Sequence, residues 1–286
     1  MKRSNLTTMA VAFGIALLQT TAAAQSGPGP FLHGSPGEHQ QGGVVRPHLH
    51  VNSRWDECSI QLNAALTQRA WRQFTQEAGL VAYFRPLSDA KPMGKGKFEL
   101  SILQWKTGID DNDAAWNDTF VHPDSTHWLF EGSGLEFPGL MVRAGVSNKT
   151  DVGIYATKNP NANYGFYGAQ VQQNLVESNT WDAAARASFT SLFGPEDVNF
   201  TVFGLDLVAS REIPLTSWAA VSPYVGVSSY FTMSRELSPV VDLDNEYVGG
   251  SQAMAGAVLQ LSGARLGIEY NAAKVNSLSM KVGFGR

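Results

Sequence analysis

The chain has 286 residues, of which 43% are hydrophobic and 16% are charged, and its formal net charge is −4. The only apolar run long enough to suggest a spanning helix lies at the N-terminus, which excludes a polytopic helical membrane protein. The charge content is too low for an intrinsically disordered chain, and the negative net charge argues against a broad nucleic-acid-binding surface.

Residues 1–24 have the features of a secretory signal peptide. Two basic residues follow the first methionine, and the largely apolar stretch Leu6–Leu18 comes next. Ala22 and Ala24 then satisfy the small-residue rule for signal peptidase, which places cleavage before Gln25. The sequence therefore predicts an exported protein.

Residues 25–57 are predicted to form a flexible linker, because they are rich in Gly, Pro, Gln and His and show no apolar periodicity. Four of the six histidines lie here and offer weak metal scavenging, but a polar spacer explains them better: His33, His39, His48 and His50. Cys58 is the single cysteine, so an internal disulfide is excluded. It also lies too far from the signal to be a lipoprotein cysteine.

Residues 58–95 are predicted to hold a helix followed by a periplasmic or plug segment. The helix spans Leu66–Gly79, with Thr67 as N-cap and Gly79 as the left-handed C-terminal cap. Its apolar residues share one face, so it would close the periplasmic mouth of a barrel, enter the lumen, or pack against a soluble domain. The weakly alternating stretch Leu80–Leu87 is assigned to the same segment, although pairing with a strand near Trp128 would give two more strands.

From residue 96 to residue 286 the hydrophobic period is two, which is typical of β-strands. At the C-terminal end, for example, Leu278, Met280, Val282 and Phe284 alternate with small or polar residues. Ten strands are predicted, at 96–106, 139–147, 151–158, 163–176, 183–193, 199–210, 219–234, 250–262, 264–272 and 276–285. A range of eight to twelve strands is compatible with the pattern.

A closed antiparallel transmembrane β-barrel fits these strands better than a soluble sandwich. Many of them are as long as the nine to eleven residues that a tilted spanning strand needs. The longest connections, 107–138 and 235–249, fall on the same side, where outward loops of a barrel belong. Aromatic residues recur near strand ends, as in the aromatic girdles of membrane barrels: Trp105, Tyr164, Tyr167, Trp181, Trp218 and Tyr247.

The whole arrangement resembles Gram-negative outer-membrane β-barrel proteins. The runs 140–155 and 222–227 look like hairpin segments that are common in uncharacterised proteobacterial barrels, and the likeness covers roughly residues 80–286. The chain departs from these proteins at its end, where Gly285 and Arg286 follow the usual terminal Phe. The resemblance implies location in the outer membrane, contact with lipid and lipopolysaccharide, and recognition of the C-terminal strand by the barrel-assembly machinery.

Projection of the strands predicts a charged network on the polar face, inside the lumen. Its members are Glu99, Arg143, Arg186, Asp206, Arg265, Glu269 and Lys281. Such charges are costly when unpaired in a narrow barrel, so they are expected to form salt bridges. The network either fills the lumen structurally or forms a constriction that selects small polar solutes. A passive channel or transport role, or a structural surface role, is therefore the primary functional hypothesis, with no cofactor and no enzymatic activity.

Two alternatives remain open. The helix in 66–79 would suit a carrier of hydrophobic ligands with an N-terminal hatch. The segment His122-Pro-Asp-Ser-Thr-His127 contains the residue types of a Ser/His/Asp site and would suit an outer-membrane hydrolase using His122, Ser125 or His127.

Acidic residues in the long connections are weak candidates for a metal site. Oxygen-rich loops can hold Ca²⁺, but neither group has the EF-hand pattern. The first group contains Asp110, Asp111, Asp113 and Asp118, and the second contains Asp242, Asp244 and Glu246. Solvated surface charge explains both groups better than a metal site.

Overall fold

The computed structural model describes residues 37–41, 44–48, 59–110, 112–121, 135–158, 163–178 and 180–285. The predicted signal peptide, Cys58, Asp111, the segment 122–127 and Trp128 lie outside these residues. Within the predicted linker, β1 (Gly37–Gln41) and β2 (Val44–His48) pair as an antiparallel hairpin.

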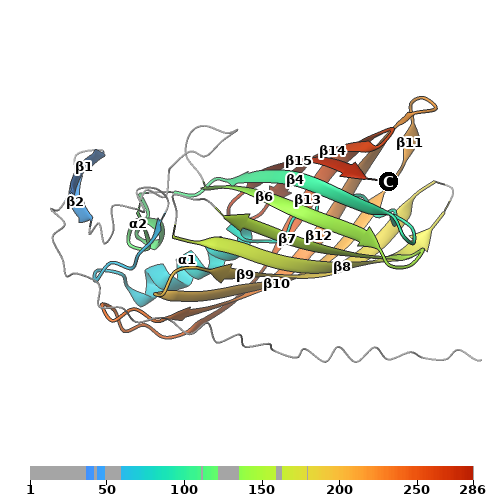
Figure 1. Ribbon diagram of the computed structural model, residues 1–286. Helices are drawn as coiled ribbons and strands as arrows, with labels where there is room; N and C mark the ends of the chain where they lie inside the picture. The colour runs from blue at the N-terminus through green and yellow to red at the C-terminus, as the bar shows by residue number, and fades with distance from the viewer. Residues whose placement is uncertain are drawn as a thin grey trace, which may run out of the picture. The chain divides into compact units, whose positions relative to one another are not determined.

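Ten long strands form a closed antiparallel barrel (Figure 1). They are β4 (Phe98–Thr107), β6 (Leu135–Gly145), β7 (Thr150–Lys158), β8 (Gly165–Glu177), β9 (Asp182–Phe193), β10 (Val198–Ser210), β12 (Ala219–Glu236), β13 (Glu246–Leu261), β14 (Ala264–Ala272) and β15 (Ser277–Gly285). Each strand pairs with the next one along the chain, and β15 pairs with β4 to close the wall. The predicted fold class and strand number are confirmed. The largest differences are at β6 and β13, which begin four residues earlier than predicted.

The outer surface of this barrel is apolar. Along most of the strands, exposed or half-buried side chains alternate with buried ones, and many of the exposed ones are large and hydrophobic, such as Ile154, Leu205 and Val225, which are 63%, 57% and 60% exposed. The alternate side chains are buried inside the wall. A belt of this kind cannot face water, so it is the membrane-spanning surface. In the described part of the chain, no helix is long and apolar enough to cross a membrane.

The aromatic residues near strand ends divide into two groups. Tyr167, Trp181, Trp218 and Tyr247 are exposed, as expected of an aromatic girdle. The girdle prediction is wrong for two residues, because Trp105 and Tyr164 are buried inside the barrel.

The two ends of the barrel differ in their connections. One end, called here the long-connection end, carries the loops β4–β6, β7–β8, β9–β10, β12–β13 and β14–β15. It includes the two longest connections, 108–134 and 237–245. The other end, called the short-connection end, carries the remaining loops together with the start of β4 and the end of β15. The short strand β11 (Ile213–Pro214) pairs with β12 at this end.

The predicted helix is present as α1 (Gln68–Val81), and the Thr67 hydroxyl accepts a hydrogen bond from the Ala70 N–H as the N-cap. The helix ends later than predicted, because Ala82 and not Gly79 is the C-cap. Gly79 serves a close approach instead, since a Cβ at this position would collide with the Thr232 side chain on β12.

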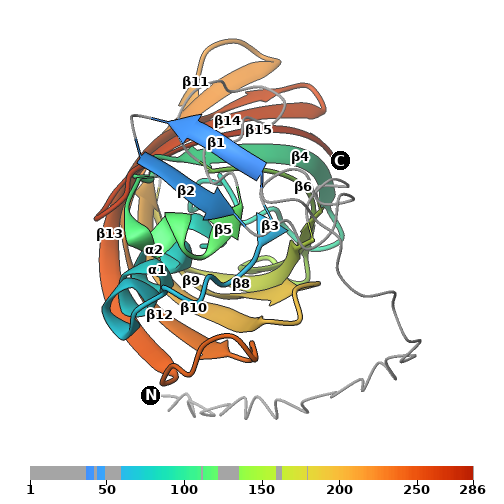
Figure 2. The same ribbon diagram turned by 90° about the vertical axis from the view of Figure 1, so that its left-hand side faces the viewer.

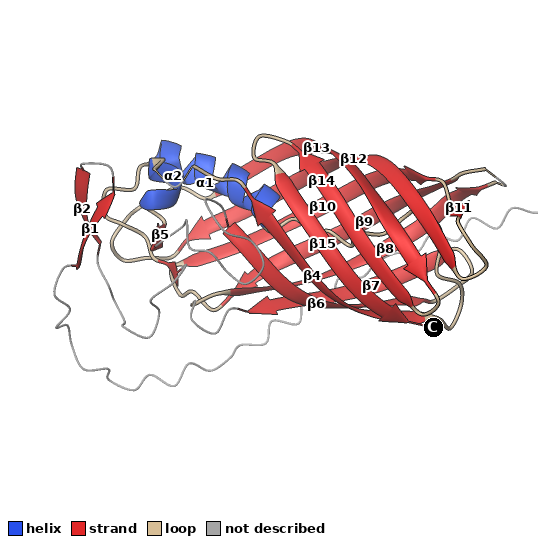
Figure 3. Ribbon diagram, turned by 90° about the horizontal axis from the view of Figure 1, so that it is seen from above, coloured by secondary structure: helices blue, strands red, loops and turns tan. Residues whose placement is uncertain are grey.

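α1 lies at the long-connection end, against β12, β13 and β4 (Figures 2 and 3). The short helix α2 (Ala114–Asn117), in the β4–β6 connection, packs against it. The short strands β3 (Ser59–Ile60) and β5 (Phe120–Val121) pair with each other, so the chain just before α1 is joined to the same β4–β6 connection. From α1 the chain continues through the lumen as an extended stretch, residues 82–97, and reaches β4 at the short-connection end.

Candidate functional site

Among the described residues, buried polar and charged side chains gather in the lumen, so it is the candidate functional site. It is occupied by residues 59–97, called here the lumen segment, which comprises β3, α1 and the extended stretch. The site therefore has two sides: the inward face of the barrel wall and the surface of the lumen segment.

The half of the lumen near the long-connection end is apolar. The α1 side chains Trp71 and Phe74 stack with ring centroids 5.5 Å apart, and Phe74 meets Trp116 edge-on at 5.1 Å. Inward-facing residues of β8 and β10 complete this cluster: Phe166, Val198, Phe200 and Val202. The apolar filling explains why Trp105 and Tyr164 face inward, because both find hydrophobic neighbours there.

Buried polar contacts fix α1 to the rim. The carboxylate of Glu77 accepts a hydrogen bond from the Trp116 indole at 2.6 Å and pairs with Lys274 at 3.1 Å. Glu246, the first residue of β13, accepts hydrogen bonds from Gln68 at 2.6 Å and from Arg72 at 2.7 Å. Because each of these carboxylates is bonded to α1 or lies on it, the helix has a defined register against the wall.

The start of the lumen segment is held by several long-side connections at once. Asn163, in the β7–β8 connection, bonds both backbone groups of Ile60, at 2.9 and 2.7 Å. The Asn63 N–H donates to the Asp118 carbonyl at 2.8 Å, in the β4–β6 connection. In the β9–β10 connection, burial raises the pKa of Asp197, and a hydrogen bond from the Leu62 backbone N–H opposes the shift.

Arg85 is the central cation of the extended stretch. Its guanidinium donates to Asn271 on β14 at 3.0 Å and to Ser277 on β15 at 3.1 Å. It also donates to the carbonyl of Leu80, in the last turn of α1, at 2.5 Å, and to the carbonyl of Tyr83, just after the helix, at 3.1 Å. The side chain thus terminates the helix and attaches it to one wall of the barrel.

Tyr83 attaches the same stretch to another part of the wall, since its hydroxyl donates to Asp206 on β10. Glu269 on β14 is engaged within the wall, accepting from Tyr224 at 2.7 Å and from Asn271 at 3.0 Å. The chain is therefore held between β10 on one side and β14 and β15 on the other.

Arg186 on β9 binds the extended stretch further along the chain, at Ser88. It donates to Gln172 at 2.7 Å and to the hydroxyl and the carbonyl of Ser88, the hydroxyl at 3.0 Å. Ala90 is held in turn by the Ser210 hydroxyl at 3.0 Å. Most hydrogen bonds of this buried arginine therefore go to the lumen segment.

Arg143 on β6 forms a buried ion pair with Asp151 on β7, at 2.5 Å between Nη2 and Oδ2. Both side chains are inaccessible to solvent. The two carboxylate oxygens of Asp151 also accept the Met93 N–H, each at 3.1 Å. The pair therefore anchors the lumen segment close to the short-connection end.

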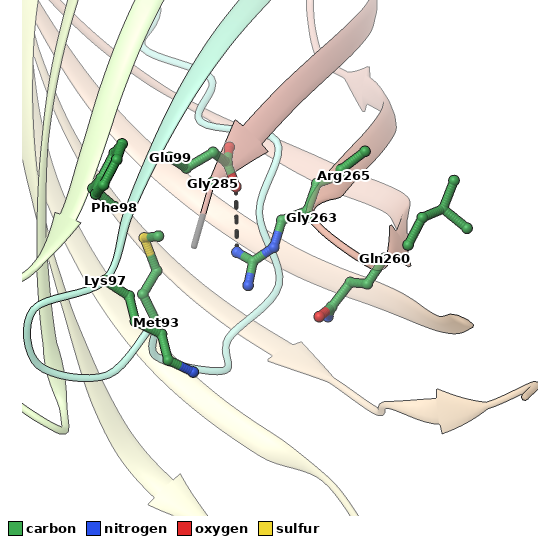
Figure 4. Close-up of a pocket in the computed structure, with 10 residues that line it drawn as sticks. Met93, Lys97, Phe98, Glu99, Gln260, Gly263, Arg265 and Gly285 are labelled. Carbon is green, nitrogen blue, oxygen red and sulfur yellow. Dashed lines mark hydrogen bonds and ion pairs between the residues drawn. The ribbon is translucent and has the colours of Figure 1, made fainter. Parts of the chain in front are cut away.

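Glu99 pairs with two cations, Lys281 at 2.8 Å and Arg265 at 3.3 Å, and accepts from Ser101 at 2.6 Å. Beside this cluster a cavity of about 140 Å³ opens at the short-connection end, and Met93 and Gln260 help to line it (Figure 4).

The structure thus brings together only part of the predicted charge set. Glu99, Arg265 and Lys281 contact one another. Arg143, Arg186 and Asp206 face the lumen but bind residues outside the predicted set, while Glu269 binds Tyr224 and Asn271 in the wall.

Sequence reasoning missed Asp151, Tyr83 and Arg85. Asp151 was recognisable, because it shares the inward face of its predicted strand with Tyr155. Tyr83 and Arg85 lie in an irregular stretch, where no periodicity indicates which wall a side chain will meet.

The weak candidates for a metal site have other partners where they are described. Asp113 caps α2 through the Ala115 N–H at 2.9 Å and accepts from Gln73 at 3.0 Å, while Asp110 accepts from the Asn112 N–H at 3.1 Å. Asp118 is the C-cap of α2. Among the described residues, no group of three or more His, Cys, Asp and Glu side chains is arranged to hold a metal ion. Asp111, His122, Ser125 and His127 lie outside the described residues.

The wall is shaped to receive the lumen segment, and Gly204 on β10 provides a test. A Cβ here would lie 2.5 Å from the Tyr83 hydroxyl oxygen, so Gly204→Ala is expected to lower the free energy of unfolding by about 1–3 kcal/mol. Gly249→Ala is the matched control, because the nearest atom would be 3.6 Å away. Both variants are measured by the temperature at which half of the protein changes its migration from the folded to the unfolded position on a gel. Equal midpoint temperatures for Gly204→Ala and Gly249→Ala would contradict the close packing of Tyr83 against Gly204. Tyr83→Ala should reduce the cost of Gly204→Ala.

No known protein family matches the sequence, and no curated protein is detectably similar to it. Several solved structures share the barrel. Ail of Yersinia pestis is 12% identical over 67% of this chain and 99% of its own, with a TM-score of 0.26. The β domain of the Bordetella autotransporter BrkA is 13% identical over 67% and 98%, with a TM-score of 0.39. The N-terminal barrel of Pseudomonas aeruginosa OprF is 9% identical over 68% and 100%, with a TM-score of 0.28. At the level of the fold, the chain resembles Gram-negative outer-membrane β-barrels.

Proposed function

We propose that this protein is an outer-membrane barrel that closes its own lumen and acts as a membrane anchor for its surface loops, without forming an open channel. The apolar outer belt and the unequal connections at the two ends support the outer-membrane location. The occupied lumen supports the closed state.

One observation carries this proposal: the lumen segment is bonded to separate parts of the wall by specific buried contacts. Tyr83 binds Asp206 on β10, and Arg85 binds Asn271 and Ser277 on β14 and β15. If the lumen segment moved out of the barrel, Asp206 and Arg186 would lose their hydrogen-bond partners on that segment. Unpaired charges are costly in a confined lumen. The wall and the segment are therefore parts of one resting structure.

Conductance in planar lipid bilayers tests the proposal. The full-length protein, refolded and checked by its heat-induced gel shift, is expected to give no stepwise current. A variant lacking residues 25–90 is expected to conduct, because it loses both α1 and most of the extended stretch. The matched control lacks only residues 25–57 and keeps the whole lumen segment, so it should stay silent. Regular current steps from the full-length protein would overturn the proposal.

A further inference from the structure

The lumen segment has a direction, and this direction determines where the chain before it must lie. The segment begins with Ser59 at the long-connection end and reaches β4 at the short-connection end. Every described strand after it belongs to the barrel wall or its connections. The first 58 residues therefore join the described fold at the end opposite the start of β4.

Residues 59–63 are bonded to several connections of the long-connection end. Ser59 and Ile60 pair with Val121 and Phe120 in the β4–β6 connection. Ile60 is bonded at both backbone groups to Asn163 in the β7–β8 connection. Leu62 donates a backbone hydrogen bond to Asp197 in the β9–β10 connection. Three connections of the long-connection end therefore hold the start of the lumen segment. The chain before Ser59 cannot approach from the short-connection end, because the lumen between is filled.

We propose that the mature chain before Ser59 is displayed on the outer surface of the cell, together with the long connections. This inference rests on the proposed outer-membrane location, in which the short turns of a barrel face the periplasm. The barrel would then present two surface elements of different kinds: loops between its strands, and an N-terminal arm of about 34 residues, numbers 25–58, that reaches the exterior through the lumen.

The composition of this arm suits such a passage. It is rich in Gly, Pro, Gln and His and has no long apolar run, so it has no tendency to remain in lipid. Its only ionisable side chains besides histidine and cysteine are Glu38, Arg46, Arg54, Asp56 and Glu57. These charges nearly cancel, so little net charge has to be moved across the membrane when the arm is placed.

The single native cysteine makes a direct test possible. In a Cys58→Ser background, Gln40→Cys places one thiol in the arm, Val240→Cys places one in the exposed β12–β13 connection, and Lys149→Cys places one in the exposed β6–β7 connection. Intact cells are treated with a membrane-impermeant maleimide, before and after the outer membrane is permeabilised. Gln40→Cys and Val240→Cys should be labelled in intact cells, and Lys149→Cys only after permeabilisation.

Each other outcome overturns the inference and says why. If Val240→Cys is labelled and Gln40→Cys behaves like Lys149→Cys, the arm is periplasmic although the barrel is placed as proposed. If Val240→Cys is itself protected, the orientation or the location of the barrel is wrong, and the proposed function fails with it. A peptide epitope inserted after Gly29, detected by antibody on intact cells, repeats the test without a change near the barrel. Absence of surface staining on cells that label at Val240→Cys would equally exclude the displayed arm.

Discussion

Replacement of Trp71 by alanine is expected to lower the free energy of unfolding by about 3–5 kcal/mol. The Trp71 side chain is fully buried, 0% exposed, and stacks on Phe74 within the apolar half of the lumen. Its loss leaves a large cavity between α1 and a rigid barrel wall, and such a wall collapses poorly around a void. The same change should also loosen α1, because the buried face supplies most of the stability of a short helix.

The control is Trp218→Ala, which removes the same side chain from a position that is 61% exposed on the outside. Its cost should be much smaller, since no packed cavity is created. Both variants are measured by urea unfolding in detergent micelles, followed by tryptophan fluorescence and by the gel shift. If Trp71→Ala and Trp218→Ala have equal effects, α1 is not packed inside the lumen as described.

Asp151→Ala is expected to cost about 3–5 kcal/mol, because it leaves the buried Arg143 guanidinium without its carboxylate. The 2.5 Å ion pair has no access to water, and the change also removes the acceptor of the Met93 N–H. The loss therefore affects the wall and the lumen segment together.

Glu212→Ala is the matched control, because Glu212 pairs with Lys91 at 2.9 Å where both side chains are partly exposed. An exposed pair of this kind contributes about 0–1 kcal/mol. The unfolding midpoint in urea is compared for the two variants and for Arg143→Met, which keeps Asp151 bonded to Met93 and should cost less than Asp151→Ala. A small effect of Asp151→Ala, similar to that of Glu212→Ala, would show that the pair is hydrated.

The wall of the barrel was predictable from the sequence because its determinants are local. An inward or outward position follows from residue parity alone, so the rows of Leu205 and Ile154 were identifiable before any pairing was known. The strand count followed from the same pattern.

The contents of the lumen were not predictable to the same degree. Arg85 meets Asn271 and Ser277, which are more than 180 residues away in sequence. No period indicates such contacts in a stretch without regular structure. Trp105 and Tyr164 were wrongly placed in the girdle because only their position near a strand end was considered. Trp105 has the parity of the inward-facing Glu99 and Ser101. Tyr164 lies just before β8, where parity no longer applies.

The C-terminal end of α1 also shows that a local pattern does not determine a tertiary contact. A glycine after an apolar helical pattern usually marks a left-handed cap. Gly79 is instead required by the approach of Thr232 from another strand, which is a tertiary demand. A local rule identified the correct residue type and the wrong cause.

The seam between β15 and β4 has a consequence for how the protein is assembled. It joins the first strand of the wall to the last strand of the wall, so the cylinder cannot be complete until β15 has been synthesised. Once the seam has formed, only the two mouths remain open, and a helix carrying Trp71 and Phe74 would have to thread through one of them against the chain that follows. The interior must therefore be filled while the wall is still an open, curved sheet, and the final zipping of β15 onto β4 seals in what has already been placed.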